Sequence, residues 1–199
     1  MSALAGVGLL VVSKHSVAGA QIEEPLVDSV RSALSAQIAD DAPPRQEEFP
    51  DTATRVHYLR WLGVTSDRLK RRKTDLITLR ERQEFLENVW YDSKRAGLDT
   101  ALVLGLIQVE SGFRKFAVSS VGARGYMQVM PFWTRLIGDG DAGKLSQMQV
   151  NLRFGCVILR HYLNVEQGDL FLALGRYNGS RGKAPYPNAV LGAKKLWQD

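Results

Sequence analysis

The stretch Asp99–Gly112 reads DTALVLGLIQVESG and is apolar over most of its length. No charged side chain lies between Asp99 and Glu110, and Ala101–Ile107 contains only apolar residues and glycine. A helix that is apolar on every side belongs in the core of a protein. Asp99 can cap the beginning of such a helix, and Gly112 can end it. The sequence therefore predicts a buried central helix that ends near Glu110.

Glu110 falls in the last turn of this predicted helix, where a carboxylate is costly. The negative end of the helix dipole and the apolar surroundings both disfavour a negative charge there. Both effects favour the neutral acid, and a carboxyl group in an apolar pocket can reach a pKa of about 6, which suits a general acid. Taken alone, the feature also fits a glutamate that simply reaches solvent at a helix end.

Helical patterns extend over most of the remaining chain, and no alternating strand pattern competes with them. Apolar residues recur at every fourth position of 26–38, and Pro43-Pro44 then breaks the pattern. Proline disfavours helix both at its own position and at the preceding one, so we expect a linker there and a second helical region from about Thr52. Further helices are expected at 76–95, 126–137, 148–163, 169–177 and 188–197.

Length and composition indicate an ordinary globular protein. The chain has 199 residues, of which 45% are hydrophobic and 24% charged, a size that fits one domain with an appendage. The lone Cys156 cannot close an internal disulfide, and it falls on the apolar face of the helix expected at 148–163, so we expect it to be buried packing. His15, His57 and His161 form no metal-ligand cluster in the sequence, and we expect no metal site.

Positive charge is concentrated in the C-terminal half. The formal net charge is +5, with 14 basic and 15 acidic residues in 1–109 against 12 and 6 in 110–199. This asymmetry fits an anionic polymer as a partner, and it equally fits solubility alone. The basic run Arg68–Lys73 accompanies no recognised nucleic-acid-binding motif, so a solvated helix face explains it better than nucleic acid binding.

The first twenty residues have the features of an export signal. Ala3–Val12 is an uncharged and mostly apolar run, and Ala18-Gly19-Ala20 after it fits an A-x-A cleavage site. A run of about ten residues is too short to cross a hydrocarbon core about 30 Å thick, so no integral membrane span is expected in the mature chain. We expect 1–20 to be a signal peptide; the alternative is a small apolar helix or tail.

Short motifs occur in a fixed order from Glu110 onward. They are Glu110–Phe113, then Gly122–Pro131, which reads GARGYMQVMP, and finally Tyr177–Gly179, with Ala117 and Ser119 between the first two. Together these motifs resemble the soluble lytic transglycosylase (SLT) family of peptidoglycan-cleaving enzymes. The resemblance covers roughly 85–197.

The resemblance implies a mainly α, lysozyme-like domain with a groove for alternating N-acetylglucosamine (GlcNAc) and N-acetylmuramic acid (MurNAc). We expect this domain over 85–199, preceded by a helical extension over 21–84 with the proline-containing linker. It implies a peptidoglycan glycan strand as partner, a periplasmic or otherwise exported location in the bacterial cell envelope, and cell-wall or secretion machinery as a further candidate partner. Tyr126 departs from the usual Leu, and Arg176, in place of the usual Ala, adds a cation beside the expected groove.

The resemblance also assigns roles to individual residues. Glu110 looks like the single catalytic acid and base, with the serines orienting the site, Gln128 and Met130 lining the sugar groove and Tyr177 hydrogen-bonding near the carboxyl group or the substrate. The expected substrate-binding residues are Ser111, Ser119, Gln128, Met130 and Tyr177. The expected structural residues near the site are Gly122, Gly125 and Asn178.

The implied reaction needs no metal or organic cofactor. Glu110 would protonate the glycosidic oxygen and then deprotonate the C6 hydroxyl of the same MurNAc, which attacks C1 and leaves a 1,6-anhydroMurNAc end. Two alternatives remain. In a lysozyme-type hydrolase, Asp139 or Asp141 would hold the attacking water, although both are more simply turn residues. A non-catalytic peptidoglycan-binding assembly protein could retain the same fold.

Overall fold

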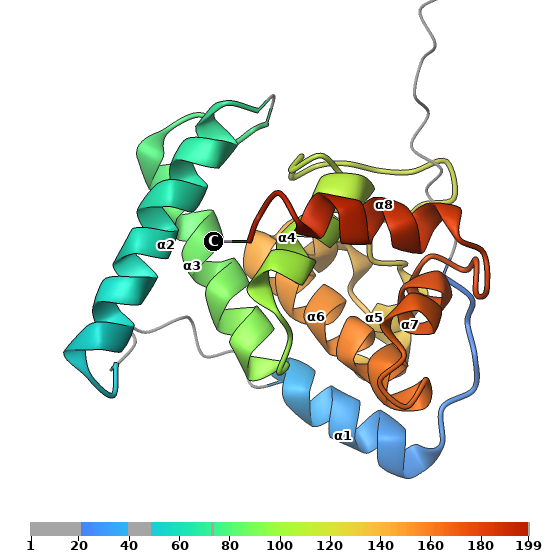
Figure 1. Ribbon diagram of the computed structural model, residues 1–199. Helices are drawn as coiled ribbons and strands as arrows, with labels where there is room; N and C mark the ends of the chain where they lie inside the picture. The colour runs from blue at the N-terminus through green and yellow to red at the C-terminus, as the bar shows by residue number, and fades with distance from the viewer. Residues whose placement is uncertain (1–20, 40–48, 73, 199) are drawn as a thin grey trace, which may run out of the picture.

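The computed structural model describes residues 21–39, 49–72 and 74–198. Over these residues the chain is helical, with isolated β-bridges but no strand (Figure 1). The expected mainly α architecture is confirmed, whereas the expected signal peptide and Pro43-Pro44 lie outside the described residues. The helices are α1 Asp28–Ala39, α2 Thr52–Lys70, α3 Leu79–Arg95, α4 Thr100–Glu110, α5 Phe132–Ile137, the 3-10 turn η1 Ala142–Ser146, α6 Met148–Val165, α7 Leu170–Tyr177 and α8 Pro185–Lys194.

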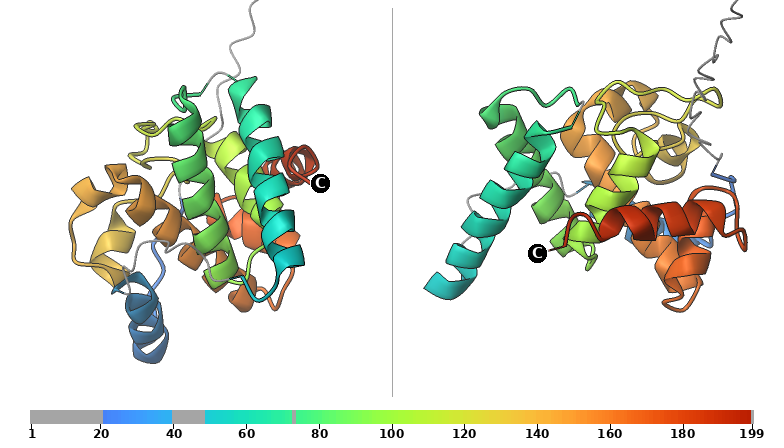
Figure 2. Two further views of the ribbon diagram at one scale, coloured as in Figure 1. Left: turned by 90° about the vertical axis from the view of Figure 1, so that its left-hand side faces the viewer. Right: turned by 45° about the horizontal axis from the view of Figure 1, so that its top comes forward.

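The central helix predicted from the sequence is α4, and almost all of its residues are buried. The Asp99 side chain caps it as expected, accepting hydrogen bonds from the backbone N–H groups of Ala101 and Leu102. α8 runs alongside α4 (Figures 1 and 2). A Cβ atom at Gly105 would lie 2.7 Å from the backbone nitrogen of Lys194, so the close contact between these helices requires glycine.

α3 and α6 complete the core around α4. α3 packs on both α4 and α6, and α7 contacts α6 and α8. Cys156 on α6 is 1% exposed, which confirms the expectation that it is buried packing. Burial raises the pKa of its thiol well above the ordinary range, so it remains a neutral thiol at neutral pH.

The two helices before the core contact different parts of it. α2 lies along α3 at one side of the molecule (Figure 1), where Tyr58, Trp61 and Trp90 form an aromatic cluster with the two tryptophan ring centroids 4.8 Å apart. α1 instead packs against α5 and α6. Each helix therefore covers its own face of the core.

The helix expected at 126–137 is wrong in its first half, because α5 begins only at Phe132. Gly125 and Gln128 both have left-handed backbone, with φ of 75° and 49°, which a continuing helix cannot accommodate. A Cβ atom at Gly125 would lie 2.4 Å from the Asn151 amide nitrogen, so this turn packs tightly onto α6.

The last helix was also predicted too late in the sequence. α8 begins at Pro185 and ends at Lys194, rather than running from 188 to 197. Proline suits the first turn of a helix, because the backbone N–H that it lacks would have no helical partner there. The other predicted helices agree with the structure to within two residues at each end, except that α3 begins three residues later than expected.

Candidate active site

Glu110 is the last residue of α4 and is 7% exposed. Its Oε1 atom accepts a hydrogen bond of 2.5 Å from the hydroxyl group of Tyr186, near the start of α8. Burial raises the pKa of Glu110 to about 8, and the hydrogen bond from Tyr186 opposes part of this rise. At neutral pH the side chain is therefore mainly a protonated acid.

No Lys or Arg of the described ranges forms an ion pair with Glu110. A nearby cation would favour the carboxylate and lower its pKa, so the absence of one preserves the acid form. The structure thus bears out the expected chemical state of this carboxyl group.

Tyr186 was not identified from the sequence. A buried tyrosine needs a partner for its hydroxyl group, but the partner here lies 76 residues earlier in the chain. Pro185 before it marks a helix start, which was the available signal that Tyr186 sits in a first helical turn. That signal gives no indication of which side chain the hydroxyl group meets.

Tyr177 at the end of α7 lies near Glu110 but donates its hydroxyl proton elsewhere. Its hydroxyl group donates to the backbone carbonyl of Met127 over 2.8 Å. Burial raises the pKa of Tyr177 well above its ordinary range, the charge of Glu110 adds to the rise, and a hydrogen bond with the Gln21 side chain lowers it slightly. Tyr177 therefore ties α7 to the turn after Gly125, beside the acid.

Like Tyr177, three other expected substrate-binding side chains are bonded to backbone groups. Ser111 Oγ donates to the carbonyl of Ile107 at 3.2 Å, and Ser119 Oγ accepts from the amide of Ala123 at 3.0 Å. Gln128 Nε2 donates to two backbone carbonyls, at 3.1 and 3.0 Å. These side chains fix the shape of the loop between α4 and α5, which follows directly after Glu110.

Three of the remaining expected residues lie within the same loop, and Asn178 lies at the end of α7. Met130 is half-buried just before α5, and Gly122 takes a φ of 87° within the loop. Gly125 makes its close approach to the Asn151 side chain, as described above. Asn178 is buried at the C-terminal end of α7, and its Oδ1 atom accepts a hydrogen bond from Ser180 Oγ.

Arg176 does not extend as an unpaired cation. Its guanidinium group contacts Glu166 at 2.7 Å and Glu24 at 2.8 Å. Arg181 binds the same Glu166 carboxylate through two nitrogens, at 2.7 and 2.8 Å. The arginine that departs from the family pattern thus joins α7 to the end of α6 and to the segment before α1.

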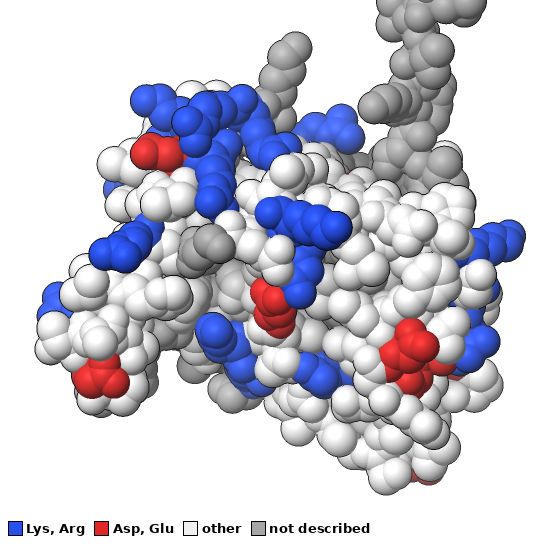
Figure 3. All heavy atoms as spheres, viewed as in Figure 1, with Lys and Arg blue, Asp and Glu red and all other residues white. Residues whose placement is uncertain are grey.

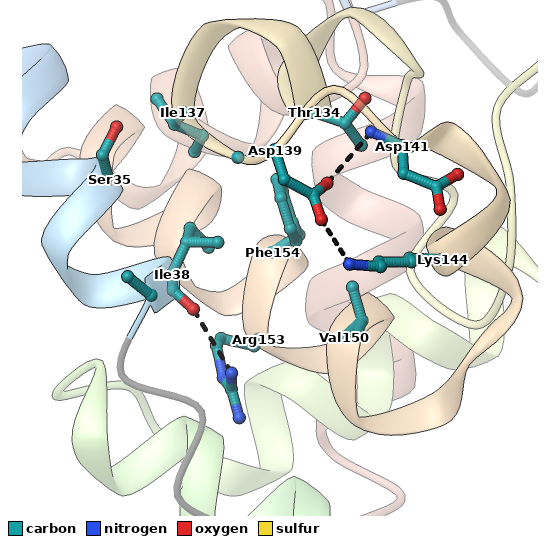
Figure 4. Close-up of a pocket in the computed structure, with 12 residues that line it drawn as sticks. Ser35, Ile38, Thr134, Ile137, Asp139, Asp141, Lys144, Val150, Arg153 and Phe154 are labelled. Atoms are coloured by element: carbon teal, nitrogen blue, oxygen red, sulfur yellow. Dashed lines mark hydrogen bonds and ion pairs between the residues drawn. The ribbon is translucent and has the colours of Figure 1, made fainter.

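Asp139 and Asp141 line a separate pocket of about 390 Å³ between α1 and the segment from α5 to α6 (Figure 4). Asp139 pairs with Lys144 and accepts a hydrogen bond from the backbone of Asp141, while Asp141 caps η1 by accepting from the Gly143 amide at 2.8 Å. Glu110 does not line this pocket. Both aspartates therefore act as the turn residues that their Gly-rich context predicts.

Three further properties bear on partners and cofactors. Lys and Arg gather over the end of α2 and the turn after it, where Lys70, Arg71 and Arg72 lie (Figure 3). No group of three or more metal-binding side chains occurs within the described part of the chain. Among the described helices, none is both long and apolar enough to span a membrane.

Residues 87–197 match the family model described as the transglycosylase SLT domain. The chain belongs to the transglycosylase SLT family. The matched region runs from within α3 through α8 and contains Glu110, Tyr177 and Tyr186. α1 and α2 lie before it.

Named relatives agree with this assignment. The chain is 34% identical over 115 residues to a transglycosylase of Enterobacteria phage PRD1, a match that covers 54% of this chain and 42% of that protein. It is 46% identical over 101 residues to the membrane-bound lytic murein transglycosylase C of Actinobacillus pleuropneumoniae serotype 5b, covering 50% and 26%. The matches therefore span less than half the length of these relatives.

One solved structure with some likeness is an inactive mutant of the lytic transglycosylase Slt from Pseudomonas aeruginosa. The identity is 22% and the TM-score 0.49, and the match covers 55% of this chain and 23% of that one.

Proposed function

We propose that this SLT-family protein is a lytic transglycosylase that cleaves the MurNAc-β-1,4-GlcNAc bond of peptidoglycan and leaves 1,6-anhydroMurNAc ends. The observation that carries the proposal is Glu110, a buried carboxyl group inside the SLT domain whose pKa is raised to about 8. Such a group holds a proton at neutral pH and can deliver it to a glycosidic oxygen. Relatives named as lytic murein transglycosylases support the same substrate.

A single carboxyl group can perform both proton transfers. Glu110 gives its proton to the glycosidic oxygen, the bond from that oxygen to C1 of MurNAc breaks, and GlcNAc leaves with a free hydroxyl group. The acetamido oxygen of MurNAc stabilises C1. The Glu110 carboxylate then takes the proton of the C6 hydroxyl, and O6 bonds to C1. No water is consumed, and Glu110 ends protonated as it began.

Tyr186 has a defined part in this cycle. After the first proton transfer Glu110 is a buried anion, which burial disfavours. The Tyr186 hydroxyl group donates to its Oε1 atom and stabilises that anion without neutralising it. We therefore assign Tyr186 the role of holding Glu110 in position and limiting how far its pKa rises.

The hydrolase alternative is less well supported by the geometry. Ordinary glycosidases use two carboxyl groups, one on each side of the scissile bond. No second carboxylate of the described ranges alters the pKa of Glu110, and Asp139 and Asp141 line a different pocket. The non-catalytic assembly protein is disfavoured because a buried acid with no cation is costly to keep without a chemical use.

We also propose that the protein is exported to the bacterial cell envelope, since peptidoglycan is found there and the first twenty residues resemble an export signal. Association with cell-wall or secretion machinery remains a prediction from the family resemblance.

Digestion of purified sacculi with the full chain tests the function. Mass spectrometry of the soluble products should find 1,6-anhydroMurNAc ends, one water lighter than the reducing ends that a hydrolase would release. Predominant reducing ends would establish the hydrolase instead. Binding to sacculi without soluble fragments would support the assembly protein.

A further inference from the structure

We propose that the segment Gln21–Glu24, which precedes α1 and lies outside the SLT match, forms one wall of the sugar groove. Within it, Gln21 acts as a positioning residue for Met130 and Tyr177. The inference rests on the proposed function, because it concerns the substrate groove of the same site.

Gln21 has the contacts of a built-in structural element. Its polar side chain is only 5% exposed, although Gln21 lies outside any helix. Its Oε1 atom accepts a hydrogen bond of 2.9 Å from the indole nitrogen of Trp133 and one of 3.4 Å from the backbone nitrogen of Met130. A buried carboxamide that is bonded in this way fixes the groups it contacts.

The same carboxamide also reaches α7. The Gln21 side chain lies close enough to the Tyr177 hydroxyl group to lower the pKa of the phenol, and this hydroxyl group donates to the carbonyl of Met127. Gln21 therefore lies between the beginning of α5, to which it is bonded, and the end of α7. Tyr177 is close enough to Glu110 to respond to its charge, so Gln21 lies next to a neighbour of the acid.

Ion pairs on the following residues hold the segment to the same two helices. Glu23 lies 3.5 Å from Arg135 of α5, and both carboxylate oxygens of Glu24 accept from Arg176 of α7, at 2.8 and 3.0 Å. Exposed pairs of this kind contribute little stability individually. Here they fix the direction of the segment, and they give Arg176 a function that its departure from the family pattern left open.

The contacts favour a segment that lines the groove over one that fills and blocks it. Glu110 is bonded to Tyr186 of α8 and not to any residue of the segment. Ile22, between the two anchored positions, is 60% exposed and points its apolar side chain away from the core. The segment therefore braces the Met130 side of the site, and the acid takes its hydrogen bond from α8 instead.

The test compares Gln21→Met and Gln21→Ala with the unchanged full chain. Methionine has nearly the volume of glutamine but cannot make these hydrogen bonds, so it separates bonding from packing. Since a lost hydrogen bond weakens an interaction about 5- to 10-fold, we expect KM for solubilised glycan strands to rise about 5- to 10-fold in both variants, with kcat changed less than about twofold. Val27→Ala, at an apolar side chain that is 71% exposed and lies between the segment and α1, is the control and should behave like the unchanged chain.

The outcomes separate the two proposals. If the unchanged chain releases no anhydro product, the proposed function fails whatever Gln21 does. If it releases that product and Gln21→Met keeps the original KM, the groove-wall proposal fails and the proposed function stands. A higher kcat/KM in Gln21→Met would also overturn the wall, because it would mean that the segment occludes the groove. If Gln21→Ala is unfolded by circular dichroism, Gln21→Met carries the test, and a fall in its melting temperature with no rise in KM would reduce Gln21 to a packing role and overturn the inference.

Discussion

Two glutamates lie at the ends of core helices of this protein, and they differ in protonation state: one is a neutral acid and the other an anion. Glu110 at the end of α4 and Glu166 directly after α6 are both buried, at 7% and 8% exposed. Hydrogen bonds from Arg181 and Arg176 lower the pKa of Glu166 to about 2, whereas burial with only a tyrosine donor raises the pKa of Glu110 to about 8. The partners of a buried carboxyl group therefore decide whether it is an anion or a neutral acid.

A third carboxyl group shows that a raised pKa alone does not mark a catalytic acid. Burial raises the pKa of Asp92 on α3 to about 7, against the opposing charges of Arg153 and Arg95. Asp92 belongs to none of the family motifs and lies on a helix that packs between core elements. Glu110 is distinguished by its motif, its position at a helix end beside a loop, and its tyrosine partner.

The largest expected effect follows from replacing Glu110. Glu110→Gln keeps the size of the side chain and an oxygen to accept from Tyr186, but it cannot donate or accept the catalytic proton. We expect activity on sacculi to fall about a thousandfold or more, with the circular dichroism spectrum unchanged. Glu87→Gln, an exposed glutamate of α3, is the control and should retain full activity. Undiminished activity in a folded Glu110→Gln protein would remove the basis of the proposed function.

The pH dependence of stability tests the charge state of Glu110 directly. The pKa of Glu110 is about 8 in the folded protein against an ordinary 4.5, so between these values the folded state holds a proton that the unfolded state has lost. The free energy of unfolding therefore falls as pH rises through this window, by an amount on the order of a few kcal/mol. Asp92 acts in the same direction.

Urea unfolding at about pH 5 and about pH 8.5 measures this dependence. We expect the decline to be smaller in Glu110→Gln, which lacks the titrating group, so that the variant is more stable than the unchanged chain at the higher pH. Asp92→Asn should remove the part of the decline in the free energy of unfolding that comes from Asp92. Equal slopes for Glu110→Gln and the unchanged chain would mean that Glu110 does not hold its proton up to pH 8.

Replacing Glu166 should affect stability rather than chemistry. Glu166→Gln leaves Arg176 and Arg181 without their shared carboxylate, and we expect the free energy of unfolding to fall by about 1–3 kcal/mol at neutral pH. The value lies below that of a fully buried pair because the Arg181 side chain is 51% exposed. Activity measured below the melting temperature should remain within about threefold of the unchanged chain.

Acid should remove the same contribution from the unchanged chain. A carboxyl group whose pKa is lowered on folding stabilises the protein above its unfolded pKa, and this contribution is lost as pH falls from about 4.5 towards about 2. The stability difference between Glu166→Gln and the unchanged chain should therefore shrink across that range. A constant difference would assign the effect to packing.

The sequence was sufficient for the parts of the protein that depend on local pattern. The absence of charge between Asp99 and Glu110 predicted α4, its cap and the buried acid, and helical spacing predicted most of the other helices, with α8 placed three residues too late. The turn over 126–131 escaped prediction because its shape depends on distant contacts. Gln128 adopts left-handed backbone while its side chain bonds to the carbonyl of Ala117, and Gly125 packs on α6.

The partners in the site were beyond local pattern for the same reason. Tyr186 meets Glu110 across 76 residues, and Gln21 meets Trp133 across 112. Nothing in the composition of either neighbourhood specifies which side chain arrives opposite it. The sequence could therefore name the acid and the motifs around it, whereas the hydrogen bonds that set its charge state required the folded chain.

A smaller effect is expected from the tyrosine that distinguishes Glu110 from Glu166. Tyr186→Phe removes the hydroxyl donor while keeping the ring, and we expect kcat to fall about tenfold because the Glu110 anion loses its stabilising bond. Since that bond lowers the pKa of Glu110, the alkaline limb of the pH–rate profile should move to higher pH. Tyr91→Phe, a half-buried tyrosine of α3, is the matched control. A limb that moves to lower pH would show that the hydroxyl group does not stabilise the carboxylate.

The smallest effect is expected at Asp139, where the transglycosylase and hydrolase readings differ most. In a hydrolase that used Asp139 to hold water, Asp139→Asn would cost at least about a hundredfold in activity. In the transglycosylase, Asp139 only pairs with Lys144 and accepts a hydrogen bond from the backbone N–H of Asp141. Both side chains of the pair are about half exposed, so the change should alter activity less than about twofold and stability by less than about 0.5 kcal/mol.

Asp141→Asn in the same turn serves as the companion variant, because asparagine keeps the oxygen that accepts from the Gly143 amide. The double variant should still release 1,6-anhydro ends, since the nucleophile is the C6 hydroxyl group of the substrate and Glu110 does not line the pocket that the two aspartates line. A large loss of activity in either single variant, together with reducing ends from the unchanged chain, would transfer the second catalytic role to this loop. Glu110 would then be one member of a pair of carboxyl groups, and its contrast with Glu166 would no longer explain the reaction.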